Sequence, residues 1–112
     1  FGGNPLACAV ALKAMEIVMR DDYVGMARRK GAAFRAALAG IRNDEIVDIR
    51  GRGLLIGVEF SVPAAPYVKK LIACGVLAKE THERTIRFAP PVNISDEDLA
   101  EAAEMIKQAL SK

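Results

Sequence analysis

Two stretches at the start of the chain place apolar residues three and four positions apart, the spacing of one face of an α-helix. The first follows Asn4 and Pro5, a pair suited to a helix start, and continues to about Arg20. The second follows a cap at Asp21 or Asp22 and continues to about Leu38. Its expected inward positions are Val24, Ala27, Gly31, Phe34, Leu38 and Ile41. The pattern therefore predicts two successive helices, and the alanines of the first favour close packing against another element.

Beyond residue 41 the apolar period changes from helical to alternating. Val47 and Ile49 fall on one side while Asp48 and Arg50 fall on the other. An apolar face then continues through Leu54, Ile56, Val58 and Phe60. This pattern predicts a β-hairpin with a short, glycine-first turn at Gly51-Arg52.

The second half of the chain predicts two more helices and two short strands. Pro63 and Pro66 open a helix that ends near Gly75, and its expected inward residues are Val68, Leu71 and Ile72. Strands are expected at 76–79 and 85–88, with a polar turn between them. Ser95, with Asp98 three residues later, begins the last helix. Its expected buried residues are Leu99, Ala102, Ala103, Ile106 and Leu110. The element order predicts an α+β fold, with a short, mostly antiparallel sheet and helices on one face.

Composition narrows the possible classes of protein. With 112 residues, of which 52% are hydrophobic, the chain suits one domain with a real core. A net charge of +2 without charge runs argues against nucleic-acid or membrane partners. Cys8 and Cys74 lie within apolar helical patterns, so we expect two buried thiols and a cytoplasmic location. Because Phe1 is not an initiator methionine and Gly2-Gly3-Asn4-Pro5 resembles the inside of a loop, we expect a piece of a longer polypeptide.

The candidate chemistry centres on Arg87, which interrupts the apolar segment Ile86-Arg87-Phe88-Ala89-Pro90-Pro91. A guanidinium stays charged and matches a carboxylate with a flat fork of donors. Arg87 is therefore either half of a structural ion pair or a hook for a carboxylate ligand. His82, the single histidine, lies in a polar turn with Glu80 and Glu83 and has no second histidine for a metal. Among the lysines, only Lys79 at a strand end is considered as a buried amine.

Three segments resemble the class III, pyridoxal-phosphate-dependent aminotransferases. They are Phe1-Gly2-Gly3-Asn4-Pro5-Leu6-Ala7, Arg50-Gly51-Arg52-Gly53-Leu54-Leu55, and the stretch from Gly75 through Thr81-His82 to Pro91. Ala78-Lys79 with Thr81-His82 before the arginine segment is similar to the ornithine branch of the class. The acetylornithine and 4-aminobutyrate enzymes are near neighbours. The resemblance covers essentially the whole chain in the right order.

The resemblance implies the small C-terminal domain of a fold type I transferase, residues 21–112, preceded by an interdomain helix at 1–20. The Schiff-base lysine and the other main cofactor contacts would lie in a large domain outside this chain. We therefore expect no pyridoxal phosphate on these residues alone. The resemblance also implies a homodimer or higher homo-oligomer, with Gly2, Gly3 and Asn4 near the cofactor phosphate of the neighbouring subunit.

The same resemblance assigns a role to Arg87. In the ornithine branch the matching arginine receives the α-carboxylate of glutamate or 2-oxoglutarate, and a large-domain glutamate pairs with it while ornithine reacts. Both roles left open for Arg87 would then hold at different stages. The implied reaction transfers the δ-amino group of ornithine to 2-oxoglutarate. The alternative from another class is a non-catalytic α+β binding or assembly module in which Arg87 pairs internally.

Overall fold

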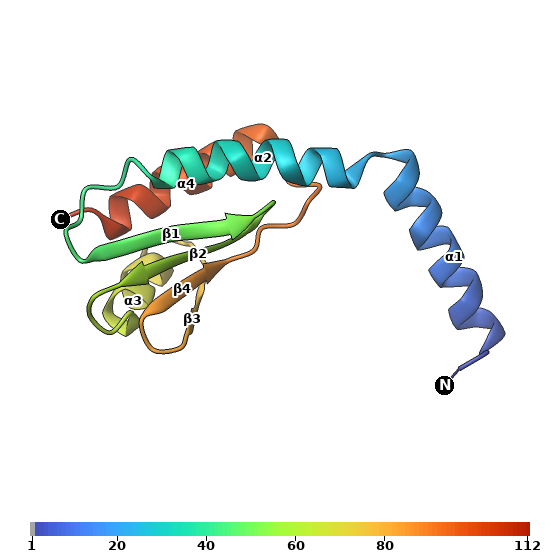
Figure 1. Cartoon of the computed structure of the whole chain (residues 1–112), viewed down its shortest axis with the longest axis horizontal. Helices are drawn as coiled ribbons and strands as arrows, with labels where there is room; N and C mark the ends of the chain where they lie inside the picture. Colours follow the sequence, from blue (N-terminus) through green and yellow to red (C-terminus); the bar gives the residue numbers. More distant parts are fainter. Residues whose placement is uncertain (1) are drawn as a thin grey trace.

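The computed structural model of the chain describes residues 2–112 and has an α+β architecture (Figure 1). In chain order the elements are α1 (Pro5–Arg20), α2 (Tyr23–Leu38), β1 (Ile46–Arg52), β2 (Leu55–Phe60), α3 (Ala65–Ala73), β3 (Lys79–Thr81), β4 (Thr85–Phe88) and α4 (Asp96–Leu110). Side-chain caps fix three of the helix starts. The side chains of Asn4, Asp22 and Ser95 accept from the backbone amides of Ala7, Gly25 and Asp98. These local bonds explain why the sequence predicted the helix bounds well.

The four strands form one sheet in the order β1-β2-β4-β3, and each neighbouring pair is antiparallel. The predicted hairpin is therefore present, but the predicted turn position was wrong. Gly51 and Arg52 belong to β1, and Arg52 pairs with Leu55. The turn is Gly53-Leu54, two residues later, because Gly53 has the positive φ, +56°, that this tight connection requires.

The core lies between one face of the sheet and helices α2, α3 and α4 (Figure 1). Its fully buried large residues come from all of these elements: Leu38, Ile56, Val58, Phe60, Leu71, Ile86, Ile106 and Leu110. The rings of Phe60 and Tyr67 stack with centroids 4.4 Å apart, which joins β2 to α3. The prediction of helices on one face is confirmed. The opposite face of the sheet, called the open face below, has no helix over it in the described chain.

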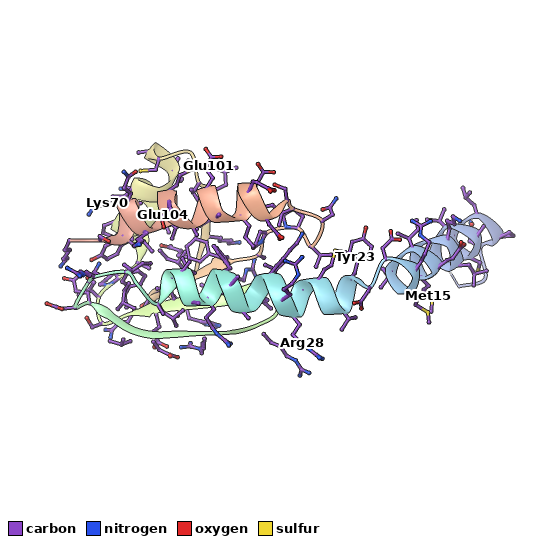
Figure 2. The ribbon with its side chains drawn as sticks, turned by 90° about the horizontal axis from the view of Figure 1, so that it is seen from above. Met15, Tyr23, Arg28, Lys70, Glu101 and Glu104 are labelled. Atoms are coloured by element: carbon purple, nitrogen blue, oxygen red, sulfur yellow. The ribbon has the colours of Figure 1, made fainter. Side chains whose placement is uncertain are left out.

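Helix α1 projects away from this core (Figure 1). The radius of gyration is 16.6 Å, against about 13 Å for a compact chain of this length. None of the residues of α1 is buried, and Met15 points into open space (Figure 2). Six large apolar residues of α1 are exposed: Leu6, Val10, Leu12, Met15, Val18 and Met19. Cys8 is exposed too, so its predicted burial was wrong, because no other element of residues 2–112 covers this part of α1.

Three further expectations need correction. Val24 is 66% exposed because the first turn of α2 extends past the end of the hairpin (Figure 1). Ile72 is 53% exposed, while Tyr67 joins Leu71 as the buried pair of α3. The third strand begins at Lys79, because the amide of Val76 instead bonds the Leu71 carbonyl in the cap that ends α3.

No helix within residues 2–112 combines the length and the apolar character needed to cross a membrane.

Candidate substrate-binding site

Arg87 lies in the middle of β4, where the chain alternates between the core and the open face. Ile86 and Phe88 are 0% and 4% exposed, whereas Arg87 between them is exposed. The alternation follows from the period of two along a strand. The guanidinium is therefore not buried by residues 2–112, although Arg87 interrupts an apolar segment.

The strand register places Arg87 in a row that crosses the open face. Gly57 of β2 pairs with Arg87 on one side, and Lys79 of β3 pairs with it on the other. Arg50 of β1 pairs in turn with Gly57. Residues directly opposite in an antiparallel sheet project from the same face. The row Arg50, Gly57, Arg87 and Lys79 thus brings three cations to one surface, with a gap at the glycine.

Arg50 binds the two carboxylates of the neighbouring row on the open face, Asp48 and Glu59. The guanidinium of Arg50 contacts Asp48 at 2.8 Å and also Glu59. These hydrogen bonds, with Asp48 first and Glu59 second, raise the pKa of Arg50 above its ordinary value. Neither Arg87 nor Lys79 forms an ion pair or a side-chain hydrogen bond with any residue from 2 to 112. All seven ion pairs within residues 2–112 join other residues.

The lack of an ion pair within residues 2–112 bears on the two roles left open for Arg87. An internal ion pair, which the non-catalytic alternative requires, is absent from the described part of the chain. An unpaired guanidinium on an exposed strand, next to a second unpaired cation, is suited to bind a carboxylate from outside these residues. Arg87 is available to such a ligand without first breaking a contact inside the domain.

A buried lysine fixes the segment that follows Arg87. Lys30 is 6% exposed, and its Nζ donates to the carbonyls of Val92 and Ile94. The expectation that Lys79 is the candidate buried amine was therefore wrong, since Lys79 is exposed and Lys30 is not. The signal was present in the sequence: Lys30 is three residues after Ala27 and four before Phe34, on the inward face of α2.

The glycines before α1 form the second predicted site element. Gly3 has a φ of +78°, and no described atom outside the adjacent residues lies within 4 Å of a Cβ built on Gly2 or Gly3. Asn4 accepts from the Ala7 amide at 3.1 Å, and this helix start is exposed. Such a terminus fits an anionic group like a phosphate. It lies at the far end of α1 from β4 (Figure 1), so this chain does not bring Asn4 and Arg87 together.

The polar turn between β3 and β4 shows no sign of chemistry. His82 and Glu83 have positive φ values of 53° and 60° and are exposed. Glu80 is exposed as well. No group of three or more potential metal ligands occurs within residues 2–112.

The family model described as "Aminotransferase class-III" matches residues 1–110. The chain belongs to the class III aminotransferases. Among curated members, it is 53% identical over 110 residues to the ornithine aminotransferase of Brevibacillus brevis, covering 98% of this chain and 28% of that protein. It is 46% identical to the Bacillus subtilis ornithine aminotransferase, covering 98% of this chain and 27% of that protein.

Solved structures of this family support the fold. The ornithine aminotransferase of Toxoplasma gondii matches with a TM-score of 0.90 at 40% identity, covering 98% of this chain and 28% of the other. The acetylornithine aminotransferase of Elizabethkingia anophelis matches with a TM-score of 0.88 at 35% identity, covering 98% of this chain and 29% of the other. The predicted class and fold are thus confirmed.

The chain spans about 28% of the length of its relatives. Class III aminotransferases depend on pyridoxal phosphate.

Proposed function

We propose that the full-length protein transfers the δ-amino group of L-ornithine to 2-oxoglutarate, giving glutamate semialdehyde and glutamate. The names of the relatives that match at 46–53% identity support this choice of substrate. Pyridoxal phosphate, when bound, would carry the amino group between the two half-reactions. Residues 1–20 would form an interdomain helix, and residues 21–112 the small C-terminal domain.

The exposed, unpaired guanidinium of Arg87 is the observation that carries the proposal. It would bind the α-carboxylate of 2-oxoglutarate or glutamate with two parallel hydrogen bonds. Ornithine reacts at its terminal amine and presents no carboxylate at the same place. The free guanidinium would then need a removable acidic partner from outside this chain, as the ornithine branch implies.

The apolar surface of α1 supports the proposed domain arrangement. Six large apolar side chains on this one helix are exposed, and an exposed apolar surface of this kind is typical of a site that packs against another part of a protein. Packing against a large domain would cover them. Gly2, Gly3 and Asn4 would then lie near the cofactor phosphate of the neighbouring subunit of a homodimer.

The test is Arg87→Leu in the full-length protein, with the two half-reactions followed separately by cofactor absorbance. Loss of a bidentate carboxylate contact should weaken the use of 2-oxoglutarate by about 2–5 kcal/mol in kcat/KM. The ornithine half-reaction should be affected much less. Arg84→Leu is the matched control, because Arg84 lies in the exposed turn before β4 and forms none of the ion pairs of residues 2–112. Equal losses in both half-reactions would point to a structural role for Arg87.

A second candidate is an acetylornithine aminotransferase, because such an enzyme matches with a TM-score of 0.88. The donors L-ornithine, N-acetylornithine and 4-aminobutyrate distinguish the candidates when each is tested at equal concentration with 2-oxoglutarate. We expect the highest kcat/KM for L-ornithine. A preference for another donor would leave the assignment to the class III aminotransferases unchanged, but would replace L-ornithine as the proposed substrate. The absence of transamination with all three would favour the non-catalytic alternative.

A further inference from the structure

Lys79 lies directly opposite Arg87 across the β3-β4 pair. The β-carbons of directly opposed residues are about 4.5–5.5 Å apart, and two like charges at such positions destabilise a sheet. Both residues are exposed, so the repulsion is weakened by water in the isolated domain. A neutral side chain at position 79 would remove the repulsion, so the lysine there suggests a role other than stabilising the sheet.

None of the nearby carboxylates in the described chain neutralises this pair. Asp48 and Glu59 are on the open face, but both bind Arg50. Glu80 pairs with the buried Ile86, which places its side chain on the other face of the sheet. The remaining neighbours on the open face, Thr81 and Thr85, carry no charge.

Gly57 lies on the opposite side of Arg87 from Lys79 and carries no side chain. It occupies the interior strand β2, where glycine weakens a sheet and often marks the close approach of a ligand or backbone. A Cβ built there would lie 3.3 Å from Cγ2 of Thr85, so the Thr85 methyl group borders this position and even alanine would crowd it. The row through Arg87 therefore has no side chain at position 57, between Arg50 and Arg87.

We propose that Lys79 is a second carboxylate-binding residue, which acts with Arg87 on the same carboxylate of the oxo acid. The guanidinium provides the directed fork, and the ammonium provides a mobile point charge within reach of the same anion. Gly57 adds no side chain on the other side of Arg87, where that carboxylate would approach. This inference rests on the proposed function, because it assigns a further residue to the same site.

The test is Lys79→Met in the full-length, cofactor-loaded protein, with 2-oxoglutarate and L-ornithine measured in separate half-reactions. We expect KM for 2-oxoglutarate to rise roughly 3- to 10-fold, with kcat and the ornithine half-reaction within twofold of wild type. The salt dependence of that KM should become weaker, because one screened charge has been removed. Lys79→Arg should restore most of the affinity.

Lys69→Met is the matched control, since Lys69 is an exposed lysine of α3, remote from the open face. We expect its KM values to stay within twofold of wild type. An unchanged KM for 2-oxoglutarate in Lys79→Met would overturn the inference and leave Lys79 as an ordinary lysine of an edge strand. Equal losses in both half-reactions would overturn it also. Either of these results for Lys79→Met leaves the proposed function intact, provided that the wild-type protein transaminates and that Arg87→Leu uses 2-oxoglutarate poorly. A wild-type protein without transaminase activity would instead remove the proposed function.

Discussion

Replacing Gly31 with alanine tests the packing of α2 on the hairpin. In a helix interior, glycine to alanine normally stabilises by about 0.8–1 kcal/mol through backbone propensity. Here a Cβ at position 31 would lie 2.0 Å from the carbonyl oxygen of Gly53 and 2.2 Å from its carbonyl carbon. Two backbones meet at this point, and neither can rotate away as a flexible side chain would.

The geometry decides the expected sign. Real Cβ contacts essentially never fall below 3.0 Å, so helix and turn must separate by at least 1 Å. Overpacking of this kind costs about 1–3 kcal/mol. The upper end applies because the obstacle is a tight turn with its glycine at a φ of +56°. After the propensity gain is subtracted, we expect a net loss of about 2 kcal/mol, or a decrease in Tm of about 8 °C.

Urea denaturation of the 112-residue chain, followed by far-ultraviolet circular dichroism, measures this difference in free energy of unfolding. Ala36→Gly at an exposed position of the same helix is the control, and it should lose about 1 kcal/mol through propensity alone. If Gly31→Ala instead raised the free energy of unfolding by about as much as Ala36→Gly lowers it, the close backbone contact would be refuted.

Two other predictions concern polar groups that hold the domain together. Lys30→Met should lower the free energy of unfolding by about 1–3 kcal/mol in the same assay, because it leaves the carbonyls of Val92 and Ile94 without their donor. An unchanged stability would show that water replaces the ammonium. Hydrogen bonds from Lys112 and then Tyr67 lower the pKa of Glu45 below its ordinary value. The stability from this shift is complete at pH values above the unfolded-state pKa of about 4.3 and is lost as the pH falls through the lowered folded-state pKa. Acid titration of Glu45→Gln should therefore show a smaller loss of stability than wild type over that range, and parallel curves would contradict the assignment.

The elements with local signals were predictable from the sequence. The caps at Asn4, Asp22 and Ser95 act within three residues, so the helix starts were close to their positions in the structure. The antiparallel sheet and the covered face followed from the alternation of apolar residues in the strands. The turn at Gly53-Leu54 was missed because two glycines were available, and only the pairing of Arg52 with Leu55 selects between them.

Exposure was harder to predict than secondary structure. Cys8 and Val24 lie in good apolar patterns yet are exposed, because an apolar stripe shows what a helix can bury and not whether a partner is present. Lys30 is the opposite case. Its position on the inward face of α2 was visible, but its burial depends on carbonyls more than sixty residues away in the chain.

Sequence by itself determined the class of this chain, its element order and the choice of Arg87 as the candidate residue that binds a carboxylate. These features depend on short motifs and on periodicity, which adjacent residues specify. Only the tertiary structure decided that Arg87 has no ion pair within residues 2–112 and that Lys79 and Gly57 flank it. The reason is that cross-strand neighbours are set by register, and register brings together Gly57 and Arg87, which are thirty positions apart.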